Sequence, residues 1–423
     1  MKTLKDDCFL HDKDRLKHED AVDLLKSQLS CIAKTQSVNL KDAANSILAQ
    51  DVTAKRPIPA TDNSAVDGYA FAHAEYQAKD GILLVEDRIA AGDKRSISIS
   101  PGSAVRIFTG APMPDGSDSV AMQEDCDIIE KGDRQFVNIP RGLKPGANCR
   151  KAGEDVRQDG LVAQSGDVLR PQDIAAIAST GTPDVNVFSP LKVALISNGD
   201  EVIRPGAPFE RGSVYDANHF MLNALLTNQR TIVVDLGICS DSSENAQSLL
   251  KHAAKNFDVI VSTGGASRGE EDHLISALET LGYCHMWQLA IKPGRPMGFG
   301  QVDKTPCFVL PGNPVAAFVC FLLYIRPALD VLGGASWREP KRYSIPSLFE
   351  ISSKPDRREF LRGATVPQTD GSLGINKFKH DGSGLITGLR EADGLIEIEE
   401  TQTSVKIGEP VRFIPFSEFG IIS

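Results

Sequence analysis

The sequence predicts a multidomain protein that combines an α/β domain with β-rich domains, and three observations lead to this fold class. The chain has 423 residues, which is too long for one hydrophobic core and indicates about three domains. From residue 190 onward, short apolar strands alternate with amphipathic helices, the pattern of a doubly wound parallel sheet. Residues 60–150 and 341–423 instead show short alternating strands separated by turns rich in Gly and Pro, which is typical of compact β domains.

Helical segments flank the first β-rich region. Residues 18–33 and 40–49 carry apolar side chains at helical spacing, so we expect a helix in each. A further helix is predicted to begin at Pro171, because proline is favoured at the first helical position.

The α/β region shows five apolar segments that suit buried strands. Most of them are separated by helical patterns, for example over residues 242–255. The longest apolar run, Val315 to Ile325, is too short to span a bilayer and predicts a buried helix. The predicted strands are Val193–Ser197, Ile232–Leu236, Val259–Ser262, Trp287–Ile291 and Cys307–Leu310.

Composition excludes several classes of function. The formal net charge of −10 argues against nucleic acid or an anionic membrane as the main partner. The charged N-terminus lacks the apolar core of a signal peptide, and the eight cysteines show no CxxC spacing. We therefore expect a cytoplasmic protein with reduced thiols, in which any catalytic metal is a hard ion bound by carboxylates.

Polar loops follow several of the predicted strands, where a parallel sheet places its ligands. Gly264 and Gly265 lie between a strand and a helix, so their backbone N–H groups can surround an anion. The alternative is that these glycines only turn the chain. Asn198–Glu201 and Pro311–Asn313 form similar loops.

Three carboxylates, those of Glu201, Asp241 and Asp272, follow different strands and are candidates to converge on Mg²⁺. Asp241 could instead cap a helix, and Asp200 leaves open which of the two neighbouring carboxylates faces the site.

The turn from Lys292 to Pro296, KPGRP, places two cations three residues apart on a rigid segment. In an acidic protein we interpret Lys292 and Arg295 as an anion clamp. The alternative is an ordinary solvated loop.

Eight segments, in the same order along nearly the whole chain, closely resemble the molybdenum-insertion enzymes of molybdenum cofactor synthesis, the MoeA and gephyrin E-domain family. The motifs are PATDNSAVDGYAF (59–71), IFTGAPMPDGSDSVAMQED (107–125), KAGED (151–155), SNGDEV (197–202), YDAN (215–218), STGGASRGEEDH (262–273), IKPGRP (291–296) and LPGNPVAAF (310–318).

The resemblance implies an elongated homodimer with its active site between the subunits. Each subunit would contain a discontinuous helical and extended linker domain for dimerisation, an inserted β-rich domain, a doubly wound molybdopterin-binding-type α/β domain and a small C-terminal β-barrel. On this sequence these domains correspond to residues 1–57 with 154–189, 58–153, 190–338 and 339–423.

The resemblance also implies a molybdopterin molybdenumtransferase: molybdate and adenylylated molybdopterin bind as substrates, and Mg²⁺-dependent cleavage of the phosphoanhydride releases AMP. By motif position, the Mg²⁺ and nucleotide phosphates would be met by Glu201, Asp241 and Asp272. Molybdate and phosphate contacts would come from Gly264, Gly265, Ser267, Lys292, Arg295, Pro311, Gly312 and Asn313, and on the barrel from Arg362 and Ser383. Asp62, Thr109 and Asp155 would act from the partner subunit.

Gln288 stands where bacterial relatives often carry a lysine, so a phosphate contact is altered at that position. Two rival functions remain: a binding scaffold, as gephyrin also is, and the sister adenylyltransferase that shares the α/β domain. The intact charged residues argue against the first, and the additional domains against the second. Partners implied by the family are the molybdopterin adenylyltransferase and maturation proteins of molybdoenzymes.

Overall fold

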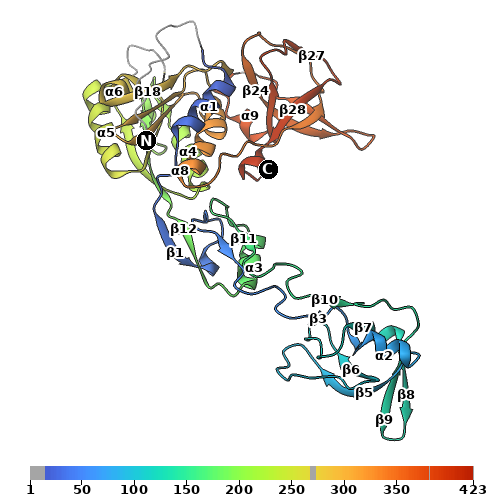
Figure 1. The fold of residues 1–423 in the computed structure, drawn as a ribbon. Coiled ribbons are helices and arrows are strands. Elements are labelled where there is room, and N and C mark those ends of the chain that lie inside the picture. Colours follow the sequence, from blue (N-terminus) through green and yellow to red (C-terminus); the bar gives the residue numbers. More distant parts are fainter. Residues whose placement is uncertain (1–14, 267–272, 381, 423) are drawn as a thin grey trace.

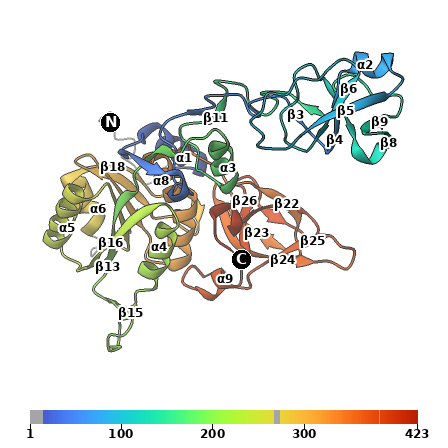
Figure 2. The same ribbon diagram turned by 90° about the horizontal axis from the view of Figure 1, so that it is seen from below.

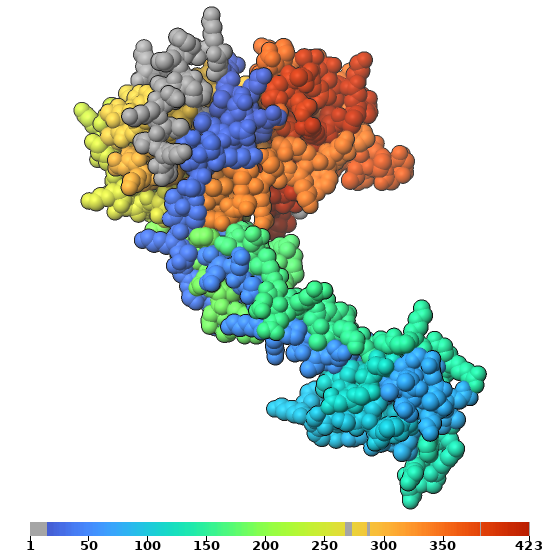
Figure 3. All heavy atoms as spheres, in the orientation of Figure 1, coloured from blue at the N-terminus to red at the C-terminus, as the bar shows by residue number. Residues whose placement is uncertain are grey.

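The computed structural model describes residues 15–266, 273–380 and 382–422. The molecule is elongated (Figure 1). The α/β domain and the C-terminal β domain lie side by side at one end, the linker lies in the middle, and the inserted β domain lies at the other end (Figures 1 and 2). In the space-filling view the inserted domain stands well apart from the α/β domain (Figure 3).

The linker is built from short antiparallel pairs, β1 with β12 and β2 with β11. Residues 40–49 form only a short 3₁₀ turn, η1, so the helix predicted there is wrong. Asn45 adopts a left-handed φ of 63°, and Ile47 and Leu48 pair in β-bridges, which makes the segment extended. The elements are β1 (Thr35–Asn39), η1 (Leu40–Asp42), β2 (Val52–Thr53), β11 (Leu161–Ala163), α3 (Pro171–Ser179) and β12 (Asp184–Phe188).

The inserted domain contains a six-stranded sheet in the order β7-β4-β6-β5-β9-β8. A short pair, β3 with β10, lies where this domain joins the linker (Figure 1). The elements are β3 (Asn63–Ser64), β4 (Gly68–Phe71), α2 (His73–Ala78), β5 (Ile82–Ile89), β6 (Ser103–Ile107), β7 (Ser119–Met122), η2 (Gln123–Asp125), β8 (Asp127–Lys131), β9 (Arg134–Asn138) and β10 (Cys149–Arg150).

The α/β domain has a six-stranded sheet in the order β16-β13-β17-β21-β20-β18. The first four strands are parallel, whereas β20 and β18 are antiparallel, so the sheet is mixed. The strand predicted at Trp287–Ile291 is wrong in position: β18 ends at Trp287, and Gln288 then turns the chain with a φ of 72°. The strands are β13 (Leu191–Asn198), β16 (Thr231–Cys239), β17 (Val259–Thr263), β18 (Gly282–Trp287), β20 (Gly298–Val302) and β21 (Thr305–Leu310).

Helices cover both faces of this sheet. Helices α5 and α6 pack on one face, while α4, α7, α8 and the N-terminal α1 share the core on the other. The apolar run from Val315 lies in a continuous helical stretch, Pro314–Leu332, which is long and apolar enough to cross a membrane but is almost wholly buried in this core. The helices are α1 (His18–Gln28), α4 (Ala217–Thr227), α5 (Ser243–Asn256), α6 (His273–Leu281), α7 (Pro314–Cys320), the π-helical η3 (Phe321–Ile325) and α8 (Arg326–Leu332).

The C-terminal domain is a small β structure whose sheet takes in one strand from the α/β domain. That strand is β19 (Ile291–Lys292), which pairs with β24, so Lys292 lies at the junction of the two domains. The other elements are β22 (Tyr343–Pro346), β23 (Ile351–Ser352), β24 (Arg358–Pro367), β25 (Leu373–Lys377), α9 (Thr387–Arg390), β26 (Gly394–Ile398), β27 (Ser404–Val405), β28 (Pro410–Pro415) and η4 (Phe416–Phe419).

Candidate active site

A crevice of about 710 Å³ opens at the carboxyl ends of β13, β17 and β21. One side is formed by an arm that contains the short strands β14 (Val202–Ile203) and β15 (Val214–Tyr215). The other side is completed by Gly384 and Ile386 of the C-terminal domain. Of the predicted site residues, the crevice is lined by Glu201, Asp241, Gly264, Gly265, Pro311, Gly312 and Asn313.

Glycine at position 264 is required by the close approach of two loops. Its φ is 85°, and a Cβ atom there would lie 2.5 Å from the carbonyl oxygen of Asn198. A side chain would therefore push β17 away from the end of β13. Gly264 therefore does more than turn the chain. Because it has no side chain, the loops after β13 and β17 can approach each other at the floor of the crevice.

The carboxylate of Asp241 is oriented by two donors. Its Oδ1 accepts from Asn198 Nδ2 at 2.9 Å, and its Oδ2 accepts from the Asp200 N–H at 3.1 Å. Asp200 in turn accepts from the Asp241 N–H at 3.0 Å, while Glu201 lines the crevice. Asp241 is therefore not a helix cap, since α5 begins after Ser242 without a side-chain cap.

Oxygen donors in the crevice suit a hard cation. Glu201 and Asp241 supply carboxylates, and the neighbouring Asn198 Oδ1 is a buried acceptor that has no hydrogen-bond partner among the described residues. Asp272, the third predicted ligand, and Ser267 lie outside the described residues. Within residues 15–266, 273–380 and 382–422, no three His, Cys, Asp or Glu side chains form a cluster that could hold a metal ion.

Asn218 is a site residue that sequence reasoning missed. It is buried, and its Nδ2 donates to Thr263 Oγ1 at 2.8 Å and to the Gly312 carbonyl at 2.7 Å. These bonds tie the start of α4 to the ends of β17 and β21, and both Asn218 and Thr263 line the crevice. The available signal was its place in the YDAN motif, two residues after the Asp216 that caps α4.

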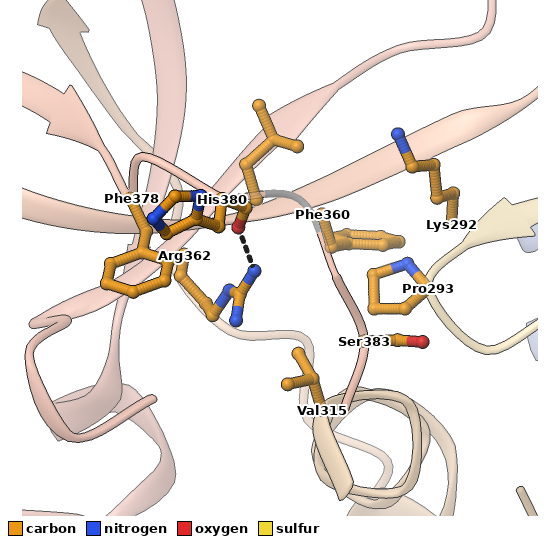
Figure 4. A pocket seen from close by; sticks show the side chains of 9 residues that line it. Lys292, Pro293, Val315, Phe360, Arg362, Phe378, His380 and Ser383 are labelled. Atoms are coloured by element: carbon orange, nitrogen blue, oxygen red, sulfur yellow. Dashed lines mark hydrogen bonds between the residues drawn. The ribbon is translucent and has the colours of Figure 1, made fainter. Parts of the chain in front are cut away.

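A small pocket of about 20 Å³ lies next to the crevice, and two cations from different strands line it (Figure 4). Lys292 comes from β19 and Arg362 from β24. The Arg362 guanidinium stacks on Phe378 at 4.8 Å and donates to the His380 carbonyl at 2.5 Å. Ser383 also lines the pocket (Figure 4).

Two shared segments connect the crevice and the pocket. In one segment, Pro314 lines the crevice and its neighbour Val315 lines the pocket. In the other, Gly384 lines the crevice and its neighbour Ser383 lines the pocket. The Val315 N–H donates to the Ser383 carbonyl at 3.0 Å, which fixes the two segments together. An acidic crevice therefore lies directly beside a cationic pocket.

Arg295 does not line either of these cavities. Its side chain is exposed and donates through Nε and Nη2 to Gln288 Oε1, both at 3.2 Å. The structure thus separates the two cations of the KPGRP turn: Lys292 faces the pocket, whereas Arg295 binds Gln288.

Of the other predicted residues, Asp62 directly precedes β3, Thr109 follows β6 and Asp155 follows β10. Figure 1 shows these strands far from the α/β domain of the same chain. Asp62 accepts from Lys151 Nζ at 2.7 Å, and this bond lowers the pKa of the carboxyl group. Thr109 donates its backbone N–H and its hydroxyl to Asp67, which lowers the pKa of Asp67.

Comparison with known proteins gives a consistent result. Three family profiles match in succession: "MoeA N-terminal region (domain I and II)" over residues 16–181, "Probable molybdopterin binding domain" over 194–331 and "MoeA C-terminal region (domain IV)" over 345–416.

The molybdopterin molybdenumtransferase of Haemophilus influenzae is 34% identical over 391 residues, which cover 92% of this chain and 96% of that protein. The Bacillus subtilis protein of the same name is 28% identical and covers 91% and 90%. A solved structure, the molybdopterin biosynthesis MoeA protein from Pyrococcus horikoshii, superposes with a TM-score of 0.78 at 28% identity and covers 95% of this chain and 100% of that one. The chain belongs to the MoeA family of molybdopterin molybdenumtransferases.

Proposed function

We propose that this protein inserts molybdenum from molybdate into adenylylated molybdopterin, with Mg²⁺-dependent cleavage of the phosphoanhydride and release of AMP. The observation that supports this most directly is the pairing of the two cavities. The crevice offers the carboxylates of Glu201 and Asp241 and a glycine-lined loop, and the adjoining pocket offers Lys292, Arg362 and Ser383. One substrate with a nucleotide anhydride and one with a compact oxyanion require these two kinds of environment side by side.

In this proposal the crevice binds the adenylylated substrate. Gly264 and Gly265 bring the backbone close to the phosphates, as glycine-rich loops before helices commonly do. Glu201 and Asp241, with Asp272, hold Mg²⁺, which would neutralise charge on the anhydride oxygens. Asn198 and the Asp200 N–H keep Asp241 in a fixed orientation, so the carboxylate needs little rearrangement when the cation binds.

The small pocket binds molybdate. A tetrahedral dianion suits an ammonium, a guanidinium and a hydroxyl, whereas carboxylates would repel it. Arg362 is held by the Leu385 and His380 carbonyls, so its planar group is oriented before any ligand arrives. Lys292 lines the same pocket, where it also stabilises negative charge on the leaving phosphate.

A second copy of the chain completes the site. Asp62, Thr109 and Asp155 follow or precede β3, β6 and β10, which lie far from the α/β domain of their own chain (Figure 1). In our proposal they would therefore reach the crevice of a partner in a twofold homodimer. We propose a cytoplasmic enzyme that receives its substrate from the molybdopterin adenylyltransferase and passes the product to molybdoenzyme maturation proteins. Nucleic acid and membranes are not proposed as partners.

The test is a defined reaction: purified protein is incubated with adenylylated molybdopterin, Mg²⁺ and molybdate, and AMP is followed by chromatography. AMP should form only when Mg²⁺ and molybdate are both present. Absence of AMP from the complete mixture, with the substrate shown to be intact, would exclude this function.

A further inference from the structure

Lys292 is held by a buried carboxylate that does not line the pocket. Strands β19 and β24 run parallel, and their register places Lys292 directly beside Glu359. The distance from Lys292 Nζ to Glu359 Oε2 is 3.3 Å, and the two side chains are 36% and 2% exposed. Residues 360–362, but not Glu359, reach the pocket wall, so Glu359 lies behind the lysine.

The same carboxylate binds a second cation. Arg357 Nη2 lies 2.5 Å from Glu359 Oε1, so the two oxygens of Glu359 serve one cation each. Arg357 does not line the pocket. Since Glu359 is shared, it neutralises only part of the charge on Lys292 and leaves the pocket cationic.

We propose that Glu359 is a positioning residue for the oxyanion pocket: it fixes the Lys292 ammonium at the pocket wall so that the ammonium meets molybdate without losing further freedom. This inference rests on the proposed function of the pocket. A lysine has a flexible four-carbon stem, and ordering this stem costs conformational entropy. The contact with Glu359 orders the stem before molybdate binds, so less entropy is lost on binding. A carboxylate near an anion site weakens anion binding by charge alone, so its presence here needs such a compensating effect.

The proposal is testable because the negative charge of Glu359 and its positioning of Lys292 have opposite effects on molybdate affinity. The charge by itself weakens binding, whereas the positioning strengthens it. Glu359→Asp keeps the charge but withdraws the oxygen from Lys292, so we expect molybdate affinity to fall about fivefold or more. Glu359→Gln removes the negative charge and should also weaken binding, whereas an electrostatic effect alone would strengthen it. Affinity is measured as the KM for molybdate in AMP release and as the Kd for molybdate by calorimetry, on protein whose thermal unfolding shows that it is folded.

A double-mutant cycle identifies the residue through which Glu359 acts. In a Lys292→Ala background, Glu359→Asp should cause no further loss, because the group it positions is gone. Arg357→Lys is the matched control: it changes the other partner of Glu359 but keeps a cation beside it, so the KM for molybdate should stay unchanged.

Unchanged or tighter molybdate binding in Glu359→Asp, or full additivity with Lys292→Ala, would overturn the positioning role. These results are distinct from failure of the proposed function, in which the wild-type protein would neither bind molybdate nor release AMP.

Discussion

Two carboxylates in the regions that carry the predicted site residues, those of Asp241 and Asp67, are oriented by neutral donors rather than by cations. Asp241 accepts from an amide side chain and a backbone N–H, and Asp67 accepts twice from Thr109. A carboxylate held in this way keeps its full negative charge available for a ligand, whereas an ion-paired one does not. Asp241 therefore suits a cation site better than Asp62, whose charge is shared with Lys151.

Asp241→Asn should abolish Mg²⁺-dependent AMP release while leaving the fold intact. The amide keeps a single acceptor oxygen and loses the charge, so about 1–3 kcal/mol of stability is at risk. The measurement is AMP release across a range of Mg²⁺ concentrations, together with thermal unfolding. Asp258→Asn is the control, because Asp258 accepts from the Lys192 N–H at the opposite end of the sheet. If the Asp241→Asn protein kept the Mg²⁺ dependence of the wild type, Asp241 would not belong to the site.

His18 should make the α/β domain less stable as the pH falls. Burial, with the nearby charge of Arg358, lowers its pKa from the ordinary value of 6.5 to about 3. Between these values the unfolded chain takes up a proton that the folded chain does not, so stability falls by about 1.4 kcal/mol per pH unit below pH 6.5.

The His18→Phe variant tests this effect. It loses the 2.8 Å hydrogen bond to the Tyr324 hydroxyl and starts less stable. Its Tm should nevertheless fall less steeply than that of the wild type between about pH 7.5 and pH 5.5. Parallel Tm curves for the two proteins would show that His18 does not titrate on unfolding.

At the scale of elements, the turn from β19 toward β20 sets the position of the cationic pocket. Gly294 has a φ of 108°, and a Cβ atom there would lie 2.5 Å from Cys320 Sγ in α7. The turn can pack against the central helix only because residue 294 has no side chain. The KPGRP turn is therefore fixed by tertiary packing as well as by its own prolines.

Gly294→Ala should lower both the Tm and the affinity for molybdate. Left-handed strain costs about 1–3 kcal/mol, and the clash adds to it. Gly237→Ala is the matched control, since its φ is 86° with no atom within 4 Å of a new Cβ. Adding Cys320→Ala to Gly294→Ala should recover part of the loss, and equal losses in the two glycine variants would show that the clash is unimportant.

At the scale of the whole molecule, the elongated shape separates the motifs that carry the family resemblance into two groups. Asp62 and Thr109 belong to the inserted domain, and Asp241 and Lys292 belong to the other end (Figures 1 and 3). In the proposed dimer, assembly of two chains would combine the two groups in one site, and this gives a direct test.

The Asp62→Asn protein and the Asp241→Asn protein should each be inactive. A mixture of the two proteins should be active. After subunit exchange, half of the dimers are mixed and carry one intact site of two, so about a quarter of the wild-type activity returns. The double variant mixed with either single variant should stay inactive. No recovery, with exchange shown by mass spectrometry, would place the whole site within one chain.

Periodicity and turn chemistry predicted the strands of the parallel sheet and the buried helix after Pro314, because these depend on neighbouring residues. They failed where long-range contacts decide. Residues 40–49 carry helical spacing but pair as extended bridges, and β20 was missed because its Gly-rich sequence is a weak strand former that is stabilised by β18 and β21.

The sequence by itself determined which residues supply charge and the order in which they occur, since these are covalent properties of the chain. Only the tertiary structure decided that Glu201 and Asp241 share a crevice, that Lys292 joins Arg362 while Arg295 turns away to Gln288, and that Glu359 lies behind Lys292. Those relations depend on strand register and domain packing, because they join residues that are distant in the chain and meet only in the folded protein.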